Sequence, residues 1–130
     1  MIPYDKRDGK IWYNSDLVDW SDVKLHVLSH GLHYGSCVFE GERVYDGNIF
    51  KLEEHTSRFF YSAKRMGFEI PYSESDINIA TKKNCISSKC KKWLCETSGL
   101  ERKRDDGNIS STNKNSCSHC NLGVGILFRP

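Results

Sequence analysis

The chain has 130 residues and a formal net charge of +2. This length accommodates one modest domain, and so small a net charge gives no reason to expect a nucleic-acid partner. No apolar run approaches the roughly twenty residues of a membrane-spanning helix, and the N-terminal MIPYDKRDGK lacks the apolar core of a signal peptide, so we expect a cytoplasmic protein.

Two stretches near the N-terminus predict β-hairpins. In the first, KIWYNSDLVDW, apolar and polar residues alternate on both sides of a turn at residues 14–16. In the second, SCVFEGERVYDGNIFKL, the same alternation flanks an Asp46-Gly47 turn, which is typical of hairpins. We therefore expect two pairs of short strands before the first helix.

Two helices are expected after the hairpins. From residue 52 the apolar spacing changes to steps of three and four, which defines one helical face. The residues on this face are Leu52, His55, Phe59, Ala63 and Met66. Gly67 then supplies the stop. After it, Ser73 can cap a second helix, with Asp76 three residues further on and Ile77 and Ala80 facing inward.

The composition changes near residue 82. Residues 1–82 carry ten basic and thirteen acidic side chains, whereas residues 83–130 carry nine and four. Thirteen of the fifteen aromatic residues precede the change, and five of the six cysteines follow it. Because large aromatic side chains build cores, we expect residues 1–82 to fold. The strand and helix patterns make the expected fold α+β, with short strands, hairpins and one or two helices. An irregular or disordered tail is expected over residues 83–130.

The stretch VLSHGLHYGSCVFEGERVYDG, residues 27–47, is the most informative part of the sequence. His30, His33 and Tyr34, followed by Phe39-Glu40-Gly41, resemble the N-terminal domain of the branched-chain amino-acid aminotransferases, which are pyridoxal-phosphate enzymes of fold type IV. The similarity runs from about residue 11 to residue 82, and IFKLEEHTSRFFYSAKRMGFEIPYS continues it in register.

This resemblance implies an enzyme family, a cofactor and a reaction. Residues 1–82 would be part of the N-terminal domain of such an enzyme, with pyridoxal 5′-phosphate as cofactor and a homo-oligomer as the intact assembly. The implied reaction moves the amino group of leucine, isoleucine or valine to 2-oxoglutarate, giving branched 2-oxo acids and glutamate.

The resemblance also implies site residues. Arg58 matches the arginine that holds the cofactor phosphate, a role that suits a guanidinium because its fork meets phosphate oxygens with parallel hydrogen bonds. Tyr34 and Phe39 match residues of the substrate pocket, where Tyr34 would serve the substrate carboxylate in the neighbouring subunit and Phe39 would contact the branched side chain. Gly41 is expected to be a substrate-binding residue of the same pocket. From the residues alone, we would expect Arg58 to be an exposed helix residue and Phe39 to be part of the core. Tyr34 would be a packed ring, and Gly41 would mark a strand bulge.

A catalytic lysine is missing from the match. A transaminase needs a lysine that forms the internal Schiff base and then moves a proton between substrate and cofactor carbons. In the family this lysine lies well beyond position 130, and no lysine of this sequence matches its motif. No catalytic residue is therefore assigned, and we expect the chain alone not to transaminate.

The tail departs from the family. KWLCETSG stands where the family has a pattern like Tyr-x-Arg-Pro, whose arginine helps to bind the substrate carboxylate. With free choice of wobble bases, the codons of KWLCETSGLERKRDDGNIS read one base later allow NGYVRPVAWRGSEMMAIS, which resembles the family's next segment. In the same way KKNCISSKCKK allows KKIVLAANVKN. Codons for residues 81–84 can form a nearly unbroken run of adenines, so we expect a frameshift near Lys82 and an out-of-frame tail over residues 83–130.

Three alternatives stay open. One is another fold type IV enzyme, either a D-amino-acid aminotransferase or an aminodeoxychorismate lyase. Another is a non-functional gene remnant. The third is a small zinc-binding protein, with six candidate ligands. These are Cys85, Cys90, Cys95, Cys117, His119 and Cys120. Because only Cys117 and Cys120 have the two-residue gap of a zinc knuckle, and His30 and His33 lack nearby partners, no metal site is predicted.

Overall fold

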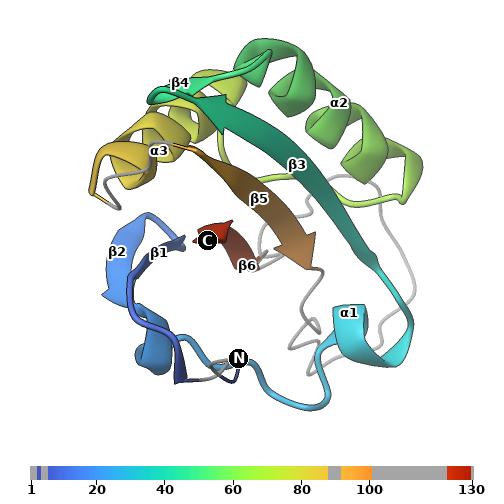
Figure 1. Cartoon of the computed structure of the whole chain (residues 1–130). Helices are drawn as coiled ribbons and strands as arrows, with labels where there is room; N and C mark the ends of the chain where they lie inside the picture. Colours follow the sequence, from blue (N-terminus) through green and yellow to red (C-terminus); the bar gives the residue numbers. More distant parts are fainter. Residues whose placement is uncertain (1–2, 4–5, 88–91, 101–122, 130) are drawn as a thin grey trace, which may run out of the picture.

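The computed structural model describes residues 3, 6–87, 92–100 and 123–129. It consists of one antiparallel sheet with helices packed against it (Figure 1). The strands are β1 (Lys10–Tyr13), β2 (Asp16–Asp19), β3 (Cys37–Tyr45), β4 (Asn48–Ile49), β5 (Lys92–Leu100) and β6 (Gly123–Arg129). The helices are the 3-10 turn η2 (Trp20–Asp22), α1 (His30–His33), α2 (Leu52–Arg65) and α3 (Glu74–Ser87). The strand order in the sheet is β2-β1-β6-β5-β3-β4, and the expected α+β class is confirmed.

Both predicted hairpins are present. β1 and β2 are joined by Asn14 and Ser15, which have φ values of 51° and 81°, and the pairing starts at Tyr13 with Asp16. β3 and β4 are joined by Asp46 and Gly47, with φ values of 49° and 82°. Positive φ at both central residues matches the right-handed twist of the flanking strands, which is why Asn, Asp and Gly are favoured there.

Helix α2 buries one stripe of side chains against the sheet and α3. The buried residues are Leu52, Thr56, Phe59 and Ala63. Met66, expected on this face, is instead 50% exposed, because it caps the helix where the chain turns away. The turn uses Gly67 at a φ of 85°, with the Gly67 N–H donating to the Lys64 carbonyl and the Phe68 N–H to the Ala63 carbonyl. This pair of hydrogen bonds is a Schellman motif, so the predicted glycine stop is confirmed.

Helix α3 begins as the sequence predicts. The Asp76 N–H donates to the Ser73 hydroxyl oxygen at 3.1 Å, and the Ser73 N–H donates to the Asp76 carboxylate at 3.0 Å. These reciprocal bonds satisfy donors that a helix N-terminus leaves open. Ile77 and Ala80 are buried as expected. The helix then continues through Ser87, past the expected end of the matching sequence.

The hydrophobic core lies between the helices and one face of the sheet. Its buried residues are Trp12, Val38, Val44, Phe59, Ala63, Phe68, Ile77, Ala80 and Cys85. Along β3, buried positions alternate with exposed ones, so Val38 and Val44 face the core whereas Phe39 and Tyr45 are 74% and 55% exposed. The sheet therefore has one face toward the helices and one face with large exposed rings.

Two strands come from the tail. β5 pairs with β3 along its whole length, from Cys37 opposite Leu100 to Tyr45 opposite Lys92. β6 then joins β5 to β1. The expectation of an irregular or disordered tail does not hold for these two stretches, because backbone pairing of β5 with β3, and of β6 with β5 and β1, organises residues that show little apolar alternation. Residues 83–87 of the expected tail are also ordered, as the last turns of α3, and residues 88–91, 101–122 and 130 lie outside the described residues.

Candidate functional site

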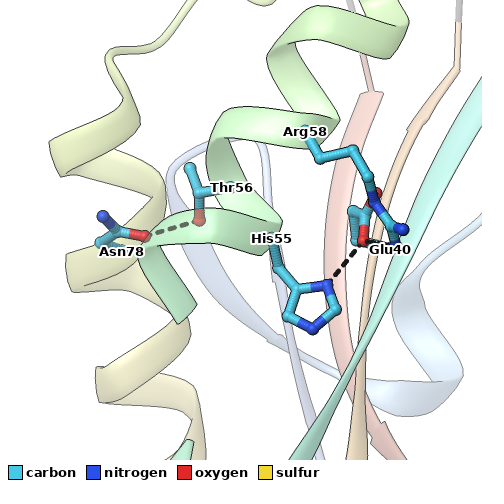
Figure 2. Close-up of polar contacts among 5 residues, drawn as sticks. All are labelled: Glu40, His55, Thr56, Arg58 and Asn78. Atoms are coloured by element: carbon cyan, nitrogen blue, oxygen red, sulfur yellow. Dashed lines mark hydrogen bonds and ion pairs between the residues drawn. The ribbon is translucent and has the colours of Figure 1, made fainter. Parts of the chain in front are cut away.

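A buried carboxylate on β3 holds the arginine that the sequence resemblance singles out. Arg58, on α2, donates from Nε and Nη2 to the two carboxylate oxygens of Glu40, each at 2.6 Å (Figure 2). His55, one helical turn earlier, lies with its Nδ1 2.8 Å from Glu40 Oε2. The Glu40 side chain is 3% exposed, whereas that of Arg58 is 65% exposed. The two residues thus form a bidentate ion pair that reaches from the core to the surface.

The contacts fix the charge of Glu40. Burial raises the pKa of the Glu40 carboxyl, but the hydrogen bonds and positive charges of Arg58 and His55 outweigh burial and bring this pKa below its ordinary value. The hydrogen bonds to Glu40 and the charge of Glu40 raise the pKa of Arg58. Glu40 is therefore an anion and Arg58 a cation at neutral pH.

Arg58 retains donors for a second anion. A guanidinium has five N–H groups, and Glu40 engages one on Nε and one on Nη2. Of the remaining three N–H groups, two are on Nη1 and one is on Nη2, on the edge of the guanidinium away from Glu40. The Arg58 side chain is mostly exposed, so this edge is accessible. This arrangement fits a phosphate group, whose oxygens would accept from that end.

The other predicted site residues lie apart from Arg58. Phe39 and Gly41 flank Glu40 on β3, so the pleat of the strand directs them to the face opposite the helices. Tyr34 follows α1 and is 72% exposed, with its ring 4.8 Å from the His30 ring between centroids. Phe39 is 74% exposed, so the alternative reading of Phe39 as a core residue is wrong for this chain. The described residues therefore present an exposed aromatic group on one face and a held arginine on the other.

Glu40 and His55 were not singled out from the sequence as site residues. The sequence did contain a signal for Glu40. It lies between Val38 and Glu42 in a strand where every second side chain is buried, and Glu40 is at one of the buried positions. A carboxylate at such a position requires a cationic or hydrogen-bonding partner. His55 was expected only as a member of the apolar helix face, and it lies at the edge of that face, next to the carboxylate.

Metal ligands and membrane segments were searched in the described ranges. Within residues 3, 6–87, 92–100 and 123–129, no group of three or more potential ligand side chains converges. Cys90, Cys117, His119 and Cys120 lie outside these ranges. None of the helices that the structure describes has the length and hydropathy of a transmembrane segment.

Comparison with known proteins identifies relatives of the sequence. Residues 37–98 match the family model described as amino-transferase class IV. A branched-chain-amino-acid aminotransferase of Pseudomonas aeruginosa is 54% identical over 80 residues, which cover 58% of this chain and 26% of the relative. One from Escherichia coli K12 is 42% identical over 76 residues, covering 55% and 25%. The predicted resemblance to this family is confirmed.

Solved structures give the same result for the fold. The branched-chain amino acid aminotransferase from Escherichia coli superposes with a TM-score of 0.79 at 29% identity, covering 95% of this chain and 41% of that one. The branched-chain aminotransferase from Thermoproteus uzoniensis, solved with norvaline, gives a TM-score of 0.78 at 28% identity, covering 95% and 41%. The chain spans about a quarter of the length of the curated relatives that it matches.

Proposed function

We propose, from the match of residues 37–98 to the class IV amino-transferase family, that this chain carries part of the N-terminal domain of a branched-chain amino-acid aminotransferase. The intact enzyme would transfer the amino group of leucine, isoleucine or valine to 2-oxoglutarate, in the cytoplasm and as a homo-oligomer. The single observation that carries the proposal is the geometry of Arg58, the residue proposed for the family's phosphate-binding position: Glu40 fixes its guanidinium and leaves three N–H groups available.

The proposed roles follow from the chemistry of these side chains. Arg58 would hold the phosphate of pyridoxal 5′-phosphate, which supplies an electron sink for the substrate carbanion when it is bound. Phe39 and Gly41, on the exposed face of β3, would line the pocket for the branched side chain, and Tyr34 would serve the substrate carboxylate. The described residues hold no lysine assigned to proton transfer, so the proposal gives this chain binding roles and no catalytic base.

We further propose that residues 1–82 are the authentic part of the domain and that residues 83–130 are read out of frame. Two buried polar side chains support this. Asn84 is fully buried at 0% exposure, where the shifted reading KKIVLAANVKN has isoleucine. Thr97 is 2% exposed, and its Oγ1 has no partner among the described residues. An unsatisfied buried hydroxyl is costly, so a native strand rarely keeps one.

The register of β5 adds a third argument. In the shifted reading, the arginine of the family's Tyr-x-Arg-Pro pattern falls at position 96, where this chain has Glu96. Position 96 is the cross-strand partner of Gly41, a predicted substrate-binding residue. The proposed frameshift would thus replace a basic residue with an acidic one at the backbone position that pairs with Gly41, where an acidic residue would not suit the binding of a substrate carboxylate.

Restoring the frame tests the proposal. One base is removed from the run that encodes residues 81–84, and both gene products are purified with added pyridoxal 5′-phosphate. The restored product should be longer by intact mass, carry the cofactor's visible absorbance and transaminate leucine, isoleucine and valine with 2-oxoglutarate. The 130-residue chain should not transaminate. A stop codon soon after the correction would contradict the frame proposal, and a cofactor-loaded restored enzyme without activity on these substrates would contradict the functional one.

A further inference from the structure

We infer that Glu40 is a positioning residue for the phosphate site: it holds the guanidinium of Arg58 by one edge so that the other edge is presented to an anion. This inference rests on the proposed phosphate role of Arg58 and assigns a function to a residue that the sequence did not single out. The relevant geometry is the pair of 2.6 Å hydrogen bonds from Nε and Nη2 to a carboxylate that is itself 3% exposed.

The exposure of the two partners makes the pair asymmetric. Glu40 is fixed by the sheet, since it stands on the buried side of a long strand that pairs with β5 along its length. Arg58 is 65% exposed, and a free arginine side chain on a helix surface samples many rotamers. Bidentate contact with a buried carboxylate selects one orientation, so the cost of ordering Arg58 is met before an anion binds.

His55 makes the carboxylate itself rigid. Its Nδ1 lies 2.8 Å from the same Oε2 that accepts from Arg58 Nη2. Both of these partners come from α2, one helical turn apart, whereas Glu40 comes from β3. The three residues therefore tie the first half of α2 to the strand that also carries Phe39 and Gly41, which are the proposed substrate-binding positions.

Glu40 has a second effect on phosphate binding, which opposes the first, so the change expected on removing its charge depends on which effect is larger. A carboxylate beside Arg58 also cancels part of the positive charge that attracts a phosphate. If neutralisation dominated, removal of the Glu40 charge would strengthen phosphate binding. Because the guanidinium is exposed, solvent and salt screen this repulsion, whereas the loss of orientation is not screened. We therefore expect orientation to dominate.

The experiment measures how strongly the full 130-residue chain prefers pyridoxamine 5′-phosphate to pyridoxamine, by fluorescence titration. These two probes differ by the phosphate and form no Schiff base with lysine. Glu40→Gln, which keeps the size of the side chain, should lower this preference about fivefold to tenfold. Glu40→Asp, which keeps the charge on a shorter side chain, should lower it as well. The matched control is Glu53→Gln, whose native carboxylate accepts from Lys82 on the exposed surface at 3.4 Å, and it should leave the preference unchanged.

Each other outcome has a defined meaning. A higher preference in Glu40→Gln, with Glu40→Asp equal to the native chain, would mean that Glu40 only neutralises charge and would overturn the inference. An equal loss of affinity for both probes would assign Glu40 to folding alone and would also overturn it. If the native chain shows no preference for the phosphorylated probe, the proposed phosphate role of Arg58 fails first and the inference fails with it.

A second readout follows the geometry without any ligand. In the native chain labelled with nitrogen-15, the Arg58 Nε–H should exchange slowly with solvent, because a buried carboxylate accepts from it. This protection should disappear in Glu40→Gln and persist in Glu53→Gln. Fast exchange of this group in the native chain would contradict the held orientation directly.

Discussion

Thr56 and Asn78 join the two long helices: the Thr56 hydroxyl of α2 donates to the Asn78 side-chain oxygen of α3 at 2.6 Å (Figure 2). Thr56 is 2% exposed, so its hydroxyl has lost access to water and depends on this partner. Thr56 thus points toward α3, while His55 and Arg58 of the same helix point toward β3. One turn of α2 therefore connects the second helix and the sheet.

This contact gives the first prediction. Thr56→Val keeps the shape of the side chain but leaves the Asn78 oxygen without its donor, so it should lower the free energy of unfolding by about 1–2 kcal/mol. Thr56→Ser keeps the hydroxyl and should cost less. Urea unfolding followed by circular dichroism measures both. Equal stability of Thr56→Val and the native chain would show that the helices do not depend on this hydrogen bond.

The N-terminus of α3 gives a second prediction. Ser73→Ala removes the acceptor for the Asp76 N–H and should cost about 1 kcal/mol of stability. Ser57→Ala, at an exposed position inside α2, is the matched control and should not destabilise. The hydrogen bonds from Ser73 lower the pKa of Asp76, so the effect of Ser73→Ala should shrink in acid, where Asp76 is protonated. A cap effect of the same size at all pH values would contradict the reciprocal bonding.

The third prediction is that the free energy of unfolding falls in acid because of Glu40. Its pKa is lower in the folded chain than the value of about 4.3 expected for an unfolded glutamate. Its contribution to stability is therefore complete above that unfolded value and is lost as the pH falls toward the folded pKa. The urea midpoint of the native chain should drop between neutral pH and acid more steeply than that of Glu40→Gln. Parallel pH profiles for the two chains would show that the carboxylate is not held in the folded state.

The largest loss of stability is expected for a substitution in the hydrophobic core. Phe59 is fully buried at 0% exposure, so Phe59→Ala removes a ring from the contact of α2 with the sheet and should cost about 3–5 kcal/mol. For a domain of this size, that loss should abolish cooperative thermal unfolding. Tyr61→Ala, two residues away and 63% exposed, serves as the control and should leave the transition in place. A retained transition in Phe59→Ala would mean that α2 does not close the core.

The elements with local signals were predictable from the sequence. The Asp46-Gly47 turn, the Gly67 stop and the Ser73 cap each depend on a preference of a few neighbouring residues for one backbone conformation, and the structure contains all three. The apolar spacing of α2 likewise located Phe59 and Ala63 in the core.

The remaining features depend on contacts between distant residues. The burial of Thr56 is explained only by Asn78, which lies on another helix, and the role of Glu40 becomes visible only when α2 is placed over β3. β5 and β6 have no clear alternation, so their assignment needs the backbone of β3 and β1 beside them. Arg58 and Phe39 were predicted as site residues through family resemblance, and their placement on opposite sides of the sheet required the structure.

The strand order has a consequence for how the chain folds. The β1–β2 and β3–β4 hairpins are not neighbours in the sheet, because β6 and β5 lie between them, and the pairing of Trp12 with Ile126 joins segments far apart in the sequence. Local hairpins form within microseconds, whereas such long-range pairing carries a large loop-closure entropy and slows folding. During synthesis on the ribosome, β1 would therefore lack its β6 partner until nearly all of this chain has been made. The unpaired edge of β1 would be exposed to other chains during that interval.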